Sequence, residues 1–535
     1  MIKNIHSIFA ICLSLSLSIS SVLTPTALSA ASPASLPTEN ASNTEKLPNH
    51  EKITFDPVHE IVSVTDHVVT IKGVEVAYQA TAGALQQKNE KGEHKASLFY
   101  VSYKRTNGED TNKRPIAFCF NGGPGAAAVW LHMGLLGPKR VVVSNDTISI
   151  PPYSYIENEY SLLDAVDLVF IDPVSTGYSR TTGNEDAKQF HGVEEDIKSV
   201  AEFIRLFATQ NGRWESPKFL IGESYGTTRA ALLADYLQDE LYMYLNGLVL
   251  VSSVLDFQTI DKMERSNDLT YLLYLPTYTA AAWYHKKLPD DLQKKDLRQV
   301  IQESKTFAIE EYSLALLKGN QLPPQKRKEI VAKLSYLSGL PPQFIERMNM
   351  RVSVFTFIKE LLKNEGKVIG RFDSRLTGID LDPCSCSSEF DPSLDGVIGV
   401  YTAAFNQYAR TDLKWVSNEE YKTLTDVFPW NYGKSSNQYL NAGTSLRKAM
   451  TKNPLLQVFV ACGLFDLATP LFATEYTYSH LGLDPSLNQN ITLGHYEAGH
   501  MMFNDMPSLV KLSGDLHEYV GKVLEQRGLP ANIKK

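Results

Sequence analysis

Cysteine, clusters of positive charge and long apolar runs are all scarce in this sequence. Only 5 of its 535 residues are cysteine, and the 52 lysines and arginines are outnumbered by 60 aspartates and glutamates. Because the basic residues are also scattered, the charge pattern argues against nucleic acid as a partner. After the N-terminal segment no run reaches the roughly 18 consecutive apolar residues of a membrane span, so no stable membrane insertion is expected.

The few cysteines leave the disulfide pattern open and argue against a metal site. Cys12 belongs to the N-terminal segment, and Cys119, Cys384, Cys386 and Cys462 remain. Four cysteines allow three full pairings, and the sequence does not choose among them. A bond between Cys384 and Cys386 would be strained, and too few further ligands lie near this C-x-C pair to hold zinc.

The N-terminus is typical of a secretory signal. Lys3 and His6 precede the apolar run "IFAICLSLSLSISSVL", and small residues follow in "TALSAAS". This pattern predicts a signal peptide over residues 1–30, cleaved near Ser29 to Ala31. Residues 31–50 are polar and contain prolines without any period, which predicts a flexible leader. We therefore expect an exported protein, periplasmic or secreted.

Short buried strands alternate with helices in the next part of the chain. "RPIAFCFNGGPG" and "AVDLVFIDPVSTGYS" each begin as an apolar strand and end in a loop. "SPKFLIGESYGTTRAALLADYL" begins in the same way and leads into a helix, and "EEDIKSVAEFIRLFATQ" has helical spacing. This alternation predicts an α/β fold with a doubly wound, mostly parallel sheet. The strand rhythm stops near residue 257 and returns with "LLQVFVACGLFDLATP". We predict a core over residues 51–256 and 441–535, with an inserted, largely helical lid or cap over 257–440.

Ser224 stands in the G-x-S-x-G pattern "GESYG", between a predicted strand and a predicted helix. A nucleophile elbow belongs at such a turn, and a serine nucleophile needs a base and an acid that orients the base. Asp466 and His500 follow later strands in the order that a hydrolase requires. An oxyanion hole needs two backbone N–H groups, and we assign them to Tyr225 and to Gly123 of "FNGGPG".

Each of these features alone has a structural explanation. A lone G-x-S-x-G pattern is often only a turn, a buried histidine is more often structural, and "NGGPG" could be a turn. All of them occur in hydrolase order, each at a predicted strand end. Their combination favours a serine hydrolase, which needs no cofactor because side chains and backbone carry the chemistry.

Four motifs carry a resemblance to a known family: "FNGGPG", "GESYG", "GLFDLATP" and "YEAGHMMFNDMP". They resemble the serine carboxypeptidases, which are cathepsin A-like enzymes of α/β-hydrolase fold. "VWLHMGLLGP" and "GESYGTTRA" are more similar to the bacterial exported branch. The resemblance implies removal of C-terminal residues from a peptide with a free C-terminus. It implies that Ser224 attacks, that His500 acts as base and acid, and that Asp466 orients His500.

The resemblance also implies a site for the terminal carboxylate of the substrate. Asn121, Gly122 and Glu223 correspond to the family's carboxylate-binding residues. In the family a second glutamate shares a proton with the first, but Leu135 occupies that position here. The family's cysteine after "NGGPG" is replaced by Ala126, so that disulfide cannot form.

The loss of the second glutamate leaves two alternatives for holding a substrate carboxylate. Glu223 shares its proton directly with the substrate, or a cation contributes, with Arg180 and Arg229 as the nearest candidates by sequence. A structural ion pair is the more common role for such arginines. We expect structural roles for His132 and His495 as well.

Two other functions remain open at this point. An esterase or acyltransferase would keep the triad and form the same acyl-enzyme, and Leu135 weakens the case for carboxylate recognition. A non-catalytic binding protein on a hydrolase scaffold is the third hypothesis. The intact Ser224, Asp466 and His500 argue against it.

Overall fold

A computed structural model of the protein describes residues 62–108, 113–143, 149–183, 185–261, 266–385 and 387–526. The predicted signal peptide over 1–30, the predicted leader over 31–50 and Cys386 lie outside these ranges. Within them, no helix combines the length and the apolar character needed to cross a membrane. All described residues belong to one compact unit.

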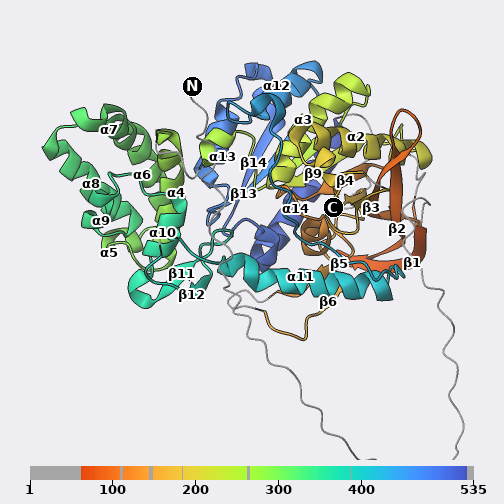
Figure 1. The fold of residues 1–535 in the computed structure, drawn as a ribbon, viewed down its shortest axis with the longest axis horizontal. Coiled ribbons are helices and arrows are strands. Elements are labelled where there is room, and N and C mark those ends of the chain that lie inside the picture. Colours follow the sequence, from red (N-terminus) through yellow and green to blue (C-terminus); the bar gives the residue numbers. More distant parts are fainter. Residues whose placement is uncertain are drawn as a thin grey trace, which may run out of the picture. The chain divides into compact units, whose positions relative to one another are not determined.

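The core is a ten-stranded sheet in the order β1-β2-β3-β7-β4-β9-β10-β13-β14, with β8 paired to β3 (Figure 1). The pairs from β1 to β7 are antiparallel, and every pair from β7 to β14 is parallel. This order confirms the predicted doubly wound, mostly parallel sheet. The strands are β1 Val62–Ile71, β2 Val74–Lys88, β3 His94–Arg105, β4 Ile116–Phe120, β7 Asp167–Ile171, β8 Arg180–Thr181, β9 Lys218–Glu223, β10 Gly247–Val251, β13 Gln457–Gly463 and β14 Ile491–Tyr496.

Helices cover both faces of the parallel strands, which is why β4, β9 and β10 are buried along their whole length. Helices α2, α3, α12 and α13 contribute to the apolar core on one face, and α11 and α14 contribute to the core on the other. Their bounds are α2 Val193–Gln210, α3 Tyr225–Glu240, α11 Pro392–Thr411, α12 Gly443–Lys452, α13 Leu471–Ser479 and α14 Met506–Glu525. The sheet is thus held between two helical layers, and its strand ends are fixed in position.

A group of helices lies between β10 and β13 in the sequence. Figure 1 shows α4–α10, in green, gathered beside the sheet on the side away from β1 and β2. These helices enclose an apolar core of their own, which also takes in Leu467 next to the predicted catalytic acid. The elements are α4 Asp268–Tyr284, α5 Asp290–Gln293, α6 Leu297–Phe307, α7 Ser313–Lys318, α8 Pro324–Ser338, α9 Pro342–Arg347, α10 Val354–Glu360, β11 Lys367–Ile369 and β12 Thr377–Ile379. The boundaries at residues 257 and 440 stay predictions.

Shorter elements follow the glycine-rich loop after β4. They are α1 Val129–Leu131, a π-helical turn His132–Leu136, β5 Lys139–Val141 and β6 Tyr155–Glu157. Val129, Leu131 and Leu135 are buried in the same core as α11 and α14. This packing anchors the C-terminal end of the loop "FNGGPG" close to the sheet.

Candidate active site

Ser224 occupies a sharp turn between β9, which ends at Glu223, and α3, which begins at Tyr225. Its φ of 59° and ψ of −127° are unfavourable for a residue with a side chain. The turn is also tightly packed, since a Cβ at Gly222 would lie 2.2 Å from the carbonyl oxygen of Gly226. Strain of this kind is kept at functional sites, and it is the geometry of a nucleophile elbow.

Asp466 and His500 form a buried hydrogen-bonded pair. Nδ1 of His500 lies 2.8 Å from Oδ2 of Asp466, and the two residues are 2% and 0% exposed. The carboxylate also accepts the N–H of Ala468 at 2.7 Å, and the N–H and hydroxyl of Thr469 at 3.0 and 2.7 Å. These bonds fix the carboxylate, and the pairing through Nδ1 leaves Nε2 of His500 as the ring nitrogen for another partner.

One cavity of about 340 Å³ brings together the predicted site residues. Ser224, His500, Asn121, Gly122, Gly123, Glu223 and Tyr225 all line it, and Asp466 lies behind His500. Its apolar lining includes Trp130, Val254, Phe257, Ile260, Leu394 and Leu424. Neither His132 nor His495 is among the lining residues.

The loop "FNGGPG" approaches the start of α3 very closely. A Cβ at Gly122 would lie 2.4 Å from the backbone nitrogen of Tyr225, so only glycine fits at this point. Tyr225 is the first residue of α3, where a backbone N–H has no partner within the helix. Gly123, with a φ of +98°, lines the same cavity. The two predicted oxyanion donors are therefore backbone groups of adjoining segments at one wall of the pocket.

Asn121 and Glu223, which both line the pocket, contact each other. Nδ2 of Asn121 donates a hydrogen bond to Oε2 of Glu223, and Glu223 is 2% exposed. Burial raises the pKa of Glu223 to about 8; the hydrogen bond from Asn121 lowers it, and the charge of Asp466 raises it further. The carboxyl is consequently protonated at neutral pH. Leu135 is 1% exposed and packs in the apolar core, so this position supplies no second carboxyl.

Neither of the two arginines considered from the sequence lines the pocket. Nε of Arg229 pairs with Oδ2 of Asp196 at 2.7 Å, and its guanidinium also donates to the backbone oxygen of Asn121. Arg180 donates to the backbone oxygens of Gly177 and Ser179, both at 2.9 Å. Both side chains thus have structural partners, and Arg229 supports the loop that carries Asn121.

The pocket contains an arginine that the sequence did not indicate. Arg371 and Phe372, from the segment after β11, form part of its wall. The ring of Phe372 lies against the ring of His500, with 4.7 Å between centroids. This segment falls in the helical region, residues 257–440, which has no recognisable motif. The sequence therefore did not indicate that Arg371 and Phe372 line the pocket.

The cysteines form none of the three pairings that the sequence allowed. Cys119, Cys384 and Cys462 are free thiols, and Cys119 and Cys462 are buried. Each full pairing of the four cysteines would join at least two of these three. Among the described residues, the site is therefore held by packing and hydrogen bonds rather than by a disulfide.

Comparison with known proteins supports the family resemblance seen in the sequence. A family model described as serine carboxypeptidase matches residues 73–492. The chain is 25% identical over 175 residues to Serine carboxypeptidase-like 26 of Oryza sativa subsp. japonica; the match covers 30% of this chain and 34% of that relative. The chain thus spans about a third of the length of this curated relative.

The fold has a counterpart among solved structures. Kex1(Δ)p, a prohormone-processing carboxypeptidase from Saccharomyces cerevisiae, has a TM-score of 0.53 at 17% identity, covering 83% of this chain and 91% of that one. At this identity the likeness concerns the fold, which is that of an α/β-hydrolase. Because the family model spans most of the sequence, the chain belongs to the serine carboxypeptidase family of peptidases.

Proposed function

We propose that the protein is a serine carboxypeptidase that releases C-terminal residues from peptides through an acyl-enzyme on Ser224. The observation that carries this proposal is a single pocket lined by Ser224, His500, Asn121 and Glu223. A nucleophile and base beside a protonated carboxyl suit a substrate whose scissile bond lies one residue from a free carboxylate.

In the proposed reaction, Oγ of Ser224 attacks the carbonyl carbon of the last peptide bond. Nε2 of His500 takes the serine proton, and Asp466 stabilises the imidazolium through its hydrogen bond to Nδ1. The N–H groups of Gly123 and Tyr225 donate to the oxyanion of the tetrahedral intermediate. His500 then gives its proton to the leaving amine. Water, deprotonated by His500, hydrolyses the acyl ester and returns Ser224 to its free form.

The terminal carboxylate of the peptide is assigned to Asn121, Gly122 and Glu223. Because Glu223 is protonated below a pKa of about 8, its O–H can donate to the substrate carboxylate. With Leu135 in place of a second glutamate, this proton is shared with the substrate alone. We therefore propose carboxylate recognition that persists to neutral pH.

The cellular setting is also a proposal. The sequence pattern of residues 1–30 suits an exported protein, and the motifs suit the bacterial exported branch of the family. The substrates would then be peptides outside the cytoplasm, with no cofactor required.

Loss of the nucleophile tests the proposal. Mass spectrometry of a peptide incubated with the purified protein should show stepwise loss of C-terminal residues, and Ser224→Ala should abolish it. Unchanged release by Ser224→Ala would refute the mechanism. A fluorophosphonate probe should label the parent protein and not the variant, and absence of labelling in both would favour a non-catalytic binding protein.

An esterase or acyltransferase is the second candidate. Leu135 favours it, because its side chain leaves Glu223 without the family's carboxyl partner. Turnover of simple esters without any response to a free terminal carboxylate would support it.

A further inference from the structure

Arg371 presents a guanidinium to the pocket without an acidic partner. Its backbone is fixed on both sides: its N–H donates to Oδ1 of Asp391 at 3.1 Å, and its carbonyl accepts the N–H of Leu467 at 3.0 Å. The side chain lies over the ring of Phe372, with Cζ 4.6 Å from the centroid. In the part of the chain that the structure describes, the guanidinium forms neither a salt bridge nor a hydrogen bond. Its five N–H donors are left for another molecule.

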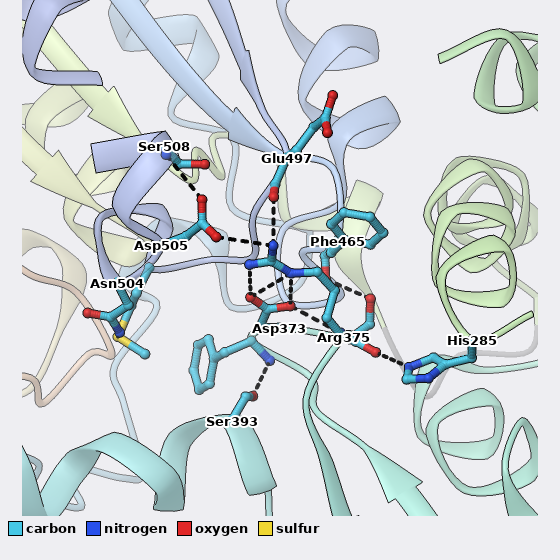
Figure 2. Close-up of polar contacts among 12 residues, drawn as sticks. His285, Asp373, Arg375, Ser393, Phe465, Glu497, Asn504, Asp505 and Ser508 are labelled. Atoms are coloured by element: carbon cyan, nitrogen blue, oxygen red, sulfur yellow. Dashed lines mark hydrogen bonds and ion pairs between the residues drawn. The ribbon is translucent and has the colours of Figure 1, made fainter. Parts of the chain in front are cut away.

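The segment that carries Arg371 is held rigidly by a polar network (Figure 2). Arg375 contacts Asp373 at 2.7 Å and Asp505 at 3.3 Å, and it donates to the carbonyl oxygen of Glu497 at 2.8 Å. On the other side, the hydroxyl of Ser374 donates to the carbonyl oxygen of Phe465 at 2.9 Å. The segment is therefore tied to both loops that carry the catalytic pair.

The segment is also bonded directly to the backbone of His500. The N–H of His500 donates to the carbonyl oxygen of Phe372 at 2.6 Å, and the N–H of Phe372 donates to Oγ of Ser393 at 3.0 Å. Arg371 is thus the immediate neighbour of a residue that is bonded to His500. The backbone that carries the Arg371 side chain is therefore fixed before a ligand binds, which reduces the entropy lost on binding.

The charges of the pocket favour an anion. Among the residues that line it, Arg371 carries the one permanent charge, and Glu223 is protonated at neutral pH. The remaining lining is largely apolar, which strengthens an electrostatic contact with a bound group. A guanidinium binds a carboxylate through two parallel hydrogen bonds, and this match is specific in geometry as well as charge.

We propose that Arg371 is a substrate-binding residue whose guanidinium binds a carboxylate of the peptide. This inference rests on the proposed function. Arg371 would be a further anion-binding group beside the carboxylate site assigned to Asn121 and Glu223. The carboxylate is the C-terminal one or that of an acidic side chain on either side of the scissile bond. Either carboxylate would be bound by a residue outside the ten-stranded sheet, and binding of an acidic side chain would make the enzyme select peptides by their negative charge.

Binding measurements in a Ser224→Ala background test this without requiring turnover. Four N-blocked dipeptides carry at most one carboxylate each: benzyloxycarbonyl-Phe-Leu acid, its amide, benzyloxycarbonyl-Phe-Glu amide and benzyloxycarbonyl-Glu-Leu amide. Calorimetry should show that Arg371→Gln lowers the affinity for at least one carboxylate-bearing peptide by about tenfold or more, as expected for a lost charged hydrogen bond. The affinity for the neutral Phe-Leu amide should change by less than about twofold.

The pattern of loss identifies the source of the carboxylate. Weakened binding of the Phe-Leu acid points to the terminal carboxylate, and weakened binding of a glutamyl amide points to the side chain on that side of the bond. Arg371→Lys should restore part of the affinity because it keeps the charge. Arg347→Gln is the matched control, since Arg347 also lies over an aromatic ring in the helical region, 5.9 Å from that of Phe344, but outside the pocket.

Three results would overturn the proposal. The first is that Arg371→Gln leaves the affinity for all three carboxylate-bearing peptides unchanged. The second is that Arg371→Gln weakens binding of the neutral amide by the same factor. The third is that the protein that keeps Arg371 binds none of the three carboxylate-bearing peptides. Failure of the proposed function looks different: the parent protein would bind a carboxylate through Arg371 and yet release no C-terminal residue.

Discussion

Replacing Glu223 by glutamine probes how the pocket reads a carboxylate. Glu223 has a pKa raised to about 8 by burial, and Asn121 donates to one of its oxygens, which leaves the other to carry the proton. Below this pKa the neutral carboxyl donates a hydrogen bond to the substrate carboxylate. Above it, two carboxylates meet in a buried site and repel each other.

The size of the effect follows from the titration. With a pKa of about 8, about half of Glu223 is protonated at pH 8 and about a tenth at pH 9. The value of kcat/KM for a peptide acid should therefore fall about tenfold between pH 7 and pH 9. A glutamine amide donates a hydrogen bond at every pH, so kcat/KM of the Glu223→Gln variant should change by less than about twofold over the same range.

The assay is release of the last residue from an N-blocked dipeptide acid, from about pH 5 to about pH 9.5. The C-terminal amide of the same dipeptide is the control, because it has no carboxylate to repel. An alkaline decline of the same size in Glu223→Gln would refute the assignment. So would an equal decline for the amide with the parent protein.

The loop "FNGGPG", the proposed catalytic acid, the buried ion pair and the buried carboxyl each predict a distinct outcome. Gly122→Ala should lower kcat on a p-nitrophenyl ester about 10²–10³-fold, because its Cβ would lie 2.4 Å from the Tyr225 nitrogen; normal turnover would argue against this oxyanion hole. Asp466→Asn should lower kcat about 10⁴-fold by analogy with other triads, with unchanged urea unfolding as the check on folding. Asp196→Ala leaves the 1% exposed Arg229 unpaired and should cost about 3–5 kcal/mol in urea unfolding; a loss under about 1 kcal/mol would contradict the pairing. The pKa of Glu223 is raised from 4.5, the value expected in the unfolded chain, to about 8 in the folded protein. The contribution of the protonated carboxyl to the free energy of unfolding is therefore fully present below the pKa of the unfolded chain and is lost as pH rises to about 8. Glu223→Gln should therefore raise Tm more at pH 8 than at pH 4.5, and an equal rise at both would count against the shift.

The sheet and the pairing of Asp466 with His500 were predictable because local motifs mark them. Each predicted site residue lies at or just after the carboxyl end of a predicted strand, and parallel strands place these ends at one edge of a sheet. The turn at Ser224 and the bond between Asp466 and His500 therefore agree with what "GESYG", "GLFDLATP" and "YEAGH" indicate.

Arg371 was not predictable for the opposite reason. It reaches the pocket through contacts between distant segments, such as the bond from His500 to the carbonyl of Phe372, and no periodic pattern records them. Arg229 was considered as a ligand for the substrate because it follows Ser224 closely. Its partner Asp196 lies on α2, and only the packing of α2 against α3 reveals the pair.

The most direct test of the account compares an N-blocked dipeptide acid with its C-terminal amide at about pH 6, where Glu223 is protonated. The purified protein is assayed on both, with Ser224→Ala as the blank. The account predicts that the acid is cleaved much faster than the amide. Equal rates would mean that the pocket does not bind a terminal carboxylate, and would contradict a carboxypeptidase in favour of an esterase or acyltransferase.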